Sequence, residues 1–298
     1  MFAARFFDRR DGIAAWTSAK TREGWYSFTN TNCIIALPSG TNYNTAMGKL
    51  KLTPQSTRGS QVASLGEDHW RFSCPGGKAG EYRLAQMDDY RGLKRSHLAW
   101  TAPCHLKLEA RASARQLAGT WGFGFWNDPF GMNLGFGGGR RLPEFPDAAW
   151  FFFASEPNHL SFRDHLPAQG ALAAVFRSPG VPLWMLAPLG AAAPLLLLRW
   201  FSRLARRFAA TLVQEDAADF TLDLTEWHSY ELIWQASGVQ YLVDGETVQR
   251  TLLSPRGPLG LVLWLDNQFA AWRPDGRLNY GTLETDARWI EIRSLAIA

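Results

Sequence analysis

The 298 residues, 46% of them hydrophobic, are enough to form one large domain or two smaller ones around a sizeable core. The formal net charge of +4 equals the charge of the four arginines between 199 and 207, so the rest of the chain is balanced, and nucleic-acid binding is not expected. Three cysteines without metal-ligand spacing indicate neither a disulfide framework nor a metal centre. No signal-peptide core follows the N-terminus, so we expect a cytoplasmic protein, with peripheral membrane contact as an alternative.

Short strands separated by Gly- and Pro-rich turns dominate the pattern after Cys74. Glu81–Leu84 is a strand candidate, and two longer stretches, 105–111 and 120–126, alternate in hydrophobicity. Their inward faces are predicted to be Leu106, Leu108 and Ala110 in the first stretch and Trp121, Phe123 and Phe125 in the second. Because long helical periodicity is almost absent, the sequence predicts an all-β sandwich.

A segment of different character follows Arg177. The 21 residues from Ser178 to Leu198 are uncharged, which approaches the length of a membrane span, but three prolines interrupt the run. From Ala191 to Val213 the pattern is helical, with a basic stripe of Arg199, Arg203, Arg206 and Arg207 beside an apolar stripe of Trp200, Phe201, Leu204, Ala205, Phe208 and Leu212. This composition is typical of an interfacial membrane segment, and a lid or an oligomer contact is the alternative.

The stretch from Leu224 to Trp272 predicts three strands. The first places Tyr230, Leu232 and Trp234 on one face, and the second ends in Asp244-Gly245, a dipeptide that closes a hairpin. The third has Leu259, Leu261, Leu263 and Leu265 on one face and Val262, Trp264 and Asp266 on the other. The third strand therefore has a core face and a face that can carry a site.

The order and spacing of these motifs resemble the C-terminal half of family-16 glycoside hydrolases, the laminarinase and lichenase group. The resemblance rests on Trp227-His228-Ser229-Tyr230, on Tyr241 to Gly245 and on Pro258 to Asn267. It implies a concanavalin A-like jelly roll, with Trp126 at the rim of a cleft. Family members often hold a structural calcium ion, but no residue of this chain can be matched to that site.

The resemblance also exposes a difference at the catalytic strand. The family carries Glu-x-Asp-x-Glu or Glu-x-Asp-x-x-Glu there, which places carboxylates on one face at the spacing that retaining hydrolysis needs. In the corresponding stretch, Asp147–Glu156, the side chains of Trp150, Phe152 and Ala154 fall at those positions. Since Glu156 could supply at best one carboxylate, we expect the family's scaffold without its chemistry.

Three carboxylates are candidates for acid/base chemistry. Asp266 shares a strand face with Trp264, and desolvation beside an indole can raise the pKa of an acid until it serves as a general acid. A turn-capping role is the alternative for Asp266, and an Asx-turn is the alternative for Asp128, which precedes Pro129. Glu156 is the third candidate.

Together these observations predict a concanavalin A-like jelly-roll β-sandwich over 1–298 as a single domain, with a helical apolar and basic insertion at about 164–215. The predicted ligand-binding residues are Trp126, Asn127, Trp150, Phe152, Trp264, Asn267 and Trp272. So lined, the groove favours a lipophilic or amphiphilic ligand that is bound at a membrane surface without hydrolysis. Acid/base transformation of that ligand, by isomerisation, hydration or cyclisation, is part of the same hypothesis. A divergent glycoside hydrolase or a glycan-binding module is the alternative. No cofactor is expected.

Overall fold

The computed structural model describes residues 18–21, 24–27, 50–129, 144–166, 168–179 and 193–298. The chain divides into two compact units, Met1–Thr41 and Asn42–Ala298. In the first unit, β1 (Ser18–Thr21) and β2 (Gly24–Ser27) form an antiparallel hairpin. Whether the whole chain behaves as a single domain stays a prediction.

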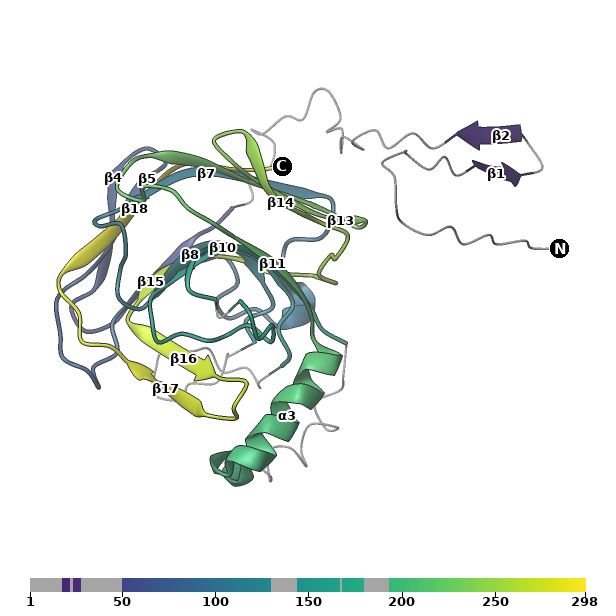
Figure 1. Ribbon diagram of the computed structural model, residues 1–298. Coiled ribbons are helices and arrows are strands. Elements are labelled where there is room, and N and C mark those ends of the chain that lie inside the picture. The colour runs from purple at the N-terminus through teal and green to yellow at the C-terminus, as the bar shows by residue number, and fades with distance from the viewer. Residues whose placement is uncertain (1–17, 22–23, 28–49, 130–143, 167, 180–192) are drawn as a thin grey trace. The chain divides into compact units, whose positions relative to one another are not determined.

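Two seven-stranded antiparallel sheets form the second unit (Figure 1). Sheet I contains, in spatial order, β11 (Gln214–Phe220), β10 (Gly170–Arg177), β9 (Ala148–Ala154), β8 (Thr120–Trp126), β15 (Gly260–Asp266), β6 (Leu84–Asp88) and β3 (Thr53–Ser56). Sheet II contains β14 (Glu246–Thr251), β13 (Gly238–Val243), β12 (His228–Gln235), β7 (Cys104–Ala112), β18 (Arg288–Ile297), β5 (His69–Cys74) and β4 (Gln61–Gly66). The predicted concanavalin A-like jelly-roll sandwich is confirmed.

The main core lies between the two sheets and follows the period-two pattern of the strands. Every side chain predicted to face inward from β7, β8, β12 and β15 is buried in this core. Trp121 stacks on Phe153 with ring centroids 3.7 Å apart, and the hydroxyl of Tyr241 on sheet II donates to the backbone oxygen of Ala174 on sheet I at 2.7 Å. This hydrogen bond gives a buried phenol the partner that its burial requires.

A second apolar layer covers the face of sheet I that is turned away from sheet II, which we call the outer face. Its buried strand residues come from β6, β9, β10, β11 and β15, and the partly buried Trp126 of β8 packs against them, because these strands carry apolar residues on both faces. Leu160, Phe162 and Leu166, from the loop between β9 and β10, pack against this layer. Much of the outer face is therefore closed by the chain itself.

The helix α3 (Arg199–Leu212) lies between β10 and β11 in sequence, after the 3₁₀ turn η2 (Ala193–Leu197). A second 3₁₀ turn, η1 (Arg95–His97), follows β6. Because β10 and β11 pair within sheet I, the segment outside the sheet spans 178–213, a narrower range than the 164–215 expected from the sequence. Residues 180–192, part of the uncharged run, lie outside the described residues.

The strands β16 (Gln268–Trp272) and β17 (Leu278–Thr282) form an antiparallel hairpin, and Figure 1 shows α3 beside it. Trp272 Nε1 donates to Ser202 Oγ at 2.9 Å, and Arg206 Nε donates to the backbone oxygen of Trp272 at 2.8 Å. The turn of the hairpin approaches so closely that a Cβ on Gly276, whose φ is +84°, would lie 2.2 Å from the backbone oxygen of Arg199. The helix is thus fixed to the hairpin by polar contacts and by a glycine.

Candidate functional site

Four aromatic side chains that the sequence placed in the groove meet on the outer face of sheet I. The ring of Trp264 lies 6.4 Å from that of Trp126, 5.8 Å from that of Trp150 and 6.0 Å from that of Phe152, between centroids. Trp150, Phe152 and Trp264 are buried, whereas Trp126 is partly exposed. Of these four side chains, Trp126 is therefore the one that a ligand can reach.

Two glycines of β8 make room for this cluster. A Cβ on Gly122 would lie 2.7 Å from Cη2 of Trp264, and a Cβ on Gly124 would lie 2.7 Å from Cβ of Trp150. Both glycines alternate with aromatic residues that face the main core. In the sequence Trp-Gly-Phe-Gly-Phe, the aromatic residues therefore pack in the core, and the glycines leave space on the other face for the indole rings.

Asp266 ends β15 on the same outer face, with its carboxylate buried. Thr120 Oγ1 donates to Asp266 Oδ1 at 2.7 Å and in turn accepts from Trp264 Nε1 at 3.0 Å, and the backbone N–H of Gln268 donates to Oδ1 at 3.2 Å. Burial raises the pKa of Asp266 to about 6, although the hydrogen bond from Thr120 opposes the shift. The side chain that the sequence proposed as a general acid is thus partly protonated near neutral pH.

Asp266→Asn is expected to stabilise the protein at about pH 8 and to have little effect below about pH 4. The folded-state pKa lies above the usual 3.8, so ionisation costs folding free energy, and stability is lost as the pH rises through about 6. An asparagine mimics the protonated form and can accept the same hydrogen bonds, so the gain should be roughly 2–3 kcal/mol above pH 6. Urea unfolding across this pH range measures it, with the exposed Asp219→Asn as the charge control. A variant no more stable than the parent at about pH 8 contradicts the expectation.

A polar edge of the outer face, on β3 and β6, was missed by sequence reasoning. Gln55 Nε2 donates to Asp88 Oδ2, and Gln86 Nε2 lies 3.0 Å from the same oxygen and 3.4 Å from the hydroxyl of Tyr90. The ring of Tyr90 lies 6.2 Å from that of Trp126, between centroids. We call Gln55, Gln86, Asp88, Tyr90 and Trp126 the polar–aromatic edge.

Two atoms of this edge have unused hydrogen-bonding capacity. Within the described part of the chain, Asp88 Oδ1 and Trp126 Nε1 are buried and have no hydrogen-bond partner. Such groups are uncommon in folded proteins, and an unfilled binding site is one physical explanation for them. The sequence signal was available: Gln86 and Asp88 alternate with Ala85 and Met87, which face the main core.

Asp88 and Asp266, two buried carboxylates on the outer face, are too far apart to act together in glycoside hydrolysis. Asp88 pairs with Val262, and Asp266 pairs with Leu84, so they are offset by four residues along the same strand pair. At about 3.3 Å per residue this offset is about 13 Å, whereas hydrolysis needs carboxyl groups about 5–5.5 Å apart for retention or 6.5–9.5 Å for inversion. Residues 130–143 and 180–192, which the structure does not describe, contain no Asp or Glu.

The other predicted site residues form hydrogen bonds within the fold or lie away from the aromatic cluster. Asn127 donates to the backbone oxygen of Phe145 at 2.9 Å, and Asn267 donates to those of Glu81 and Leu283 at 2.8 and 3.0 Å. The backbone oxygen of Asp128 accepts from Arg95 Nη2 at 2.6 Å, and its φ is +49°. Glu156 is exposed after β9, and Trp272 contacts α3. The structure therefore brings Trp126, Trp150, Phe152, Trp264 and Asp266 together and places the rest outside that cluster.

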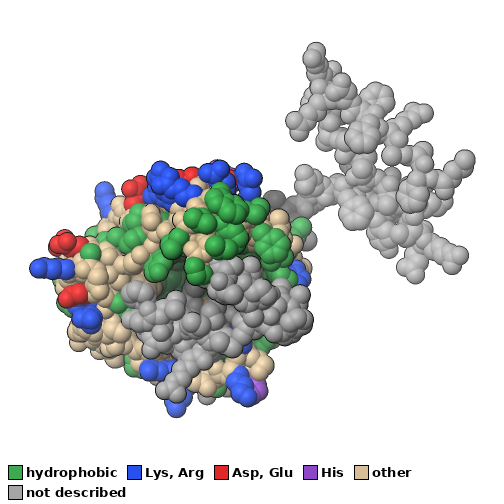
Figure 2. All heavy atoms as spheres, turned by 90° about the horizontal axis from the view of Figure 1, so that it is seen from below, with side chains coloured by type: hydrophobic (Ala, Val, Ile, Leu, Met, Phe, Trp, Pro, Cys, Tyr) green, Lys and Arg blue, Asp and Glu red, His purple; other side chains and the backbone are tan. Residues whose placement is uncertain are grey.

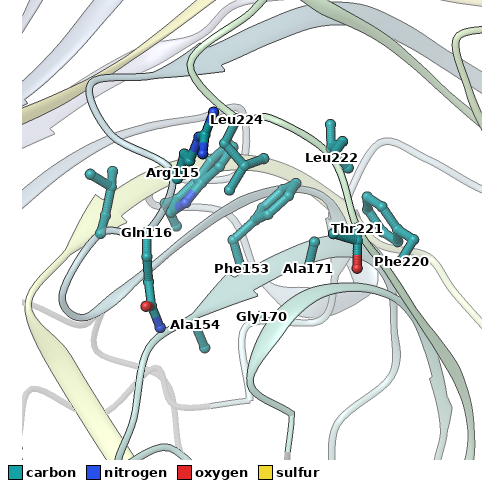
Figure 3. Close-up of a pocket in the computed structure, with 12 residues that line it drawn as sticks. Arg115, Gln116, Phe153, Ala154, Gly170, Ala171, Phe220, Thr221, Leu222 and Leu224 are labelled. Atoms are coloured by element: carbon teal, nitrogen blue, oxygen red, sulfur yellow. The ribbon is translucent and has the colours of Figure 1, made fainter.

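A separate open pocket of about 350 Å³ lies at the edge of the main core, near the ends of β8, β9 and β10 (Figure 3). Its lining is Arg115, Gln116, Leu117, Trp121, Phe153, Ala154, Gly170, Ala171, Phe220, Thr221, Leu222 and Leu224. Figure 3 shows Arg115 and Gln116 on one side and Phe220 and Thr221 on the other. Arg115 Nη2 lies 2.7 Å from Asp223 Oδ2. The pocket is mainly apolar with a polar border.

Among the described residues, no group of three or more His, Cys, Asp or Glu side chains could hold a metal ion. Among the described helices, none combines the length and apolar character needed to cross a bilayer.

Comparison with known proteins found solved structures that are similar only at low sequence identity. No protein-family model matches the sequence, and no curated protein matches it. A glycoside hydrolase family 16 endo-glucanase from Bacteroides ovatus is 10% identical, with 83% of this chain and 94% of that chain covered and a TM-score of 0.43. A legume lectin-like domain from Entamoeba histolytica is 8% identical, with 83% and 89% covered and a TM-score of 0.43. LamAcat from Zobellia galactanivorans is 14% identical, with 83% and 90% covered and a TM-score of 0.42. At these values the likeness assigns no activity.

Proposed function

We propose that this protein binds a carbohydrate without hydrolysing it, and that the polar–aromatic edge of sheet I is the site. The observation that carries this proposal is the pair of unpartnered buried atoms, Asp88 Oδ1 and Trp126 Nε1, beside the exposed part of the Trp126 ring. A sugar offers hydroxyl groups that can donate to the carboxylate and accept from the indole. Its apolar C–H face can at the same time lie against an aromatic ring.

The arrangement of Asp88 favours recognition over chemistry. Gln55 and Gln86 both donate to Oδ2 and orient the carboxylate, while Oδ1 has no partner but is enclosed, so a ligand would have to displace a covering side chain to reach it. The second buried carboxylate, Asp266, is about 13 Å away along the strands and cannot act with Asp88 on one glycosidic bond. A glycan-binding role is therefore a better fit than a divergent hydrolase.

A lipophilic or amphiphilic ligand is the second candidate, and the apolar pocket near Trp121 and Phe153 favours it. A chain of methylene groups would fit among Leu222, Leu224 and Phe220, with a polar head near Arg115. Isomerisation, hydration or cyclisation through Asp266 or Glu156 would belong to this candidate, but neither carboxylate lines the pocket. A membrane surface would deliver such a ligand, and α3 is the element that would contact the membrane.

Titration calorimetry of the full chain with β-glucan oligosaccharides tests the first proposal. Binding is expected for the parent protein, with a loss of about ten-fold to a hundred-fold in Asp88→Asn, because a hydrogen bond to a charged group is worth about 1.5–3 kcal/mol. Trp126→Ala should lose about ten-fold or more, since both the ring and its N–H are removed. Trp227→Ala is the matched control, because it removes a partly exposed indole from the opposite side of the sandwich, next to Arg111 and Arg293.

Three results would count against carbohydrate binding at this edge. One is release of reducing ends from the oligosaccharide, which would make the protein a hydrolase. Another is equal binding by the parent and by Asp88→Asn. The third is binding of fatty-acyl compounds in place of sugars, with a loss on Phe220→Ala, which would favour the apolar pocket.

A further inference from the structure

The helix α3 presents two parallel ridges to solvent. The apolar ridge is Trp200, Leu204 and Phe208, whose exposed fractions are 66%, 59% and 53%. The basic ridge is Arg199, Arg203 and Arg207, all exposed. Each ridge repeats every four residues, so the two run side by side along the helix. Leu197 and Leu198, just before the helix, extend the apolar surface.

The opposite side of α3 packs against the rest of the protein. Ser202, Arg206 and Ala209 are buried. Arg206 donates to Asp164 Oδ1 at 2.6 Å and to the backbone oxygen of Ser161 at 3.0 Å, so its charge is neutralised inside the protein. The sequence placed Arg206 with the other three arginines, whereas the structure turns it inward and leaves an outward set of three. The ridges are therefore not available to cover the outer face of sheet I.

The charge close to these ridges is mainly positive, with Asp275 as an acidic neighbour. From residue 165 to residue 214 the sequence contains no Asp or Glu. Arg203 Nη2 donates to the backbone oxygen of Asp275 at 3.2 Å, and the carboxylate of Asp275 pairs with Arg277 at 2.9 Å. Within the described residues, no ion pair joins Arg199, Arg203 or Arg207 to a carboxylate. Figure 2 shows hydrophobic side chains gathered on this side of the molecule, with Lys and Arg side chains and a few Asp or Glu side chains along one border of the patch.

We propose that α3 docks the protein on an anionic lipid bilayer, lying in the plane of the interface. The apolar ridge would enter the acyl boundary, and the three arginines beside it would contact lipid phosphates. An apolar ridge of this size is uncommon on the free surface of a soluble protein, and the adjacent row of three exposed arginines, with Asp275 as one acidic neighbour, favours a negatively charged partner. Hydrogen bonds of Ser202 and Arg206 hold the buried side of the helix against the protein, so the apolar ridge faces outward. This docking is independent of the carbohydrate site.

Co-sedimentation of the full chain with vesicles tests the proposal. The parent should bind vesicles of phosphatidylcholine mixed with phosphatidylglycerol and bind phosphatidylcholine alone far more weakly. The variant Arg199→Gln/Arg203→Gln/Arg207→Gln should lose about a hundred-fold on the mixed vesicles, at about five-fold per arginine. The variant Trp200→Ala/Leu204→Ala/Phe208→Ala should lose about ten-fold or more while keeping its thermal midpoint, because these side chains are exposed.

Two controls match these variants. Lys78→Gln/Arg91→Gln/Lys94→Gln removes the same number of exposed positive charges elsewhere, and Leu252→Ala removes a solvent-exposed leucine after β14. Both should bind the mixed vesicles like the parent. Equal losses in the charge control and in the α3 arginine variant would overturn the proposal, because net charge would then explain the binding. So would a parent protein that stays in the supernatant, or one that sediments as a dimer in solution and becomes monomeric in the ridge variant.

Discussion

Gly124→Ala is expected to lower the free energy of unfolding by more than about 4 kcal/mol, and to prevent accumulation of folded protein if total stability is ordinary. Gly124 has a φ of +150°, which L side chains rarely adopt. A Cβ there would lie 2.4 Å from the backbone oxygen of Ala149 and 2.6 Å from Cα of Trp150. Both atoms belong to the neighbouring strand, so relief of the clash requires separation of β8 from β9 in the centre of sheet I.

Gly66→Ala is the matched control for this prediction. Gly66 ends β4, an edge strand of sheet II, and a Cβ there would have no atom within 4 Å. Its effect should stay within about 0.5 kcal/mol. Urea unfolding and the yield of soluble protein measure both variants. A Gly124→Ala protein that unfolds within about 1 kcal/mol of the parent would show that sheet I adapts at this point, and the proposed reason for the glycine would be wrong.

Glu291→Gln is expected to destabilise the protein by about 2–3 kcal/mol at neutral pH. Glu291 is 1% exposed, between Arg71 on β5 and Arg111 on β7. It accepts from Arg71 Nε at 2.8 Å and from Arg111 Nε at 2.9 Å. A glutamine leaves two arginines without their counter-charge, and because both are partly exposed, the cost falls below that of a fully buried pair.

The pH dependence of this loss has a definite sign. Burial alone would raise the pKa of Glu291, but hydrogen bonds from Arg71 and Arg111 outweigh it and hold the pKa below the usual 4.5. The ionised carboxylate therefore stabilises the folded state above that pH, and this stabilisation is lost as the pH falls through the folded-state pKa. Thermal melts from about pH 8 to about pH 3 should show the difference between parent and Glu291→Gln shrinking at the acid end. The exposed Glu226→Gln is the control, and a difference that is constant with pH would contradict this account.

The main core could be predicted because burial on one face leaves a period-two record in the sequence. Leu106, Phe123 and Tyr230 were placed inward by alternation, and all three are buried between the sheets. The outer face could not be predicted in the same way. Phe162 and Leu166 reach it through a loop, and no short-range pattern indicates where a loop will fold.

The candidate site shows the same division. Trp264 and Asp266 were placed on the outer face because they share a strand face, and their clustering with Trp150 follows from strand order. The polar–aromatic edge was missed because the strand candidate stopped at Leu84, whereas β6 runs from Leu84 to Asp88. For α3, periodicity showed the stripes but could not show which one faces inward. Arg206 turns inward because Asp164 and the backbone of Trp272 lie there, both distant in sequence.

The contacts that hold α3 against the protein have a consequence for local unfolding. Its anchoring contacts come from Ser202, Arg206 and a glycine in the facing turn, while the main core lies on the far side of sheet I. Water can replace polar contacts at small net cost, whereas exposure of an apolar core is expensive. We therefore expect loss of the α3 contacts to cost less free energy than global unfolding. Because the main core does not include α3, the sandwich should stay folded when these contacts are lost.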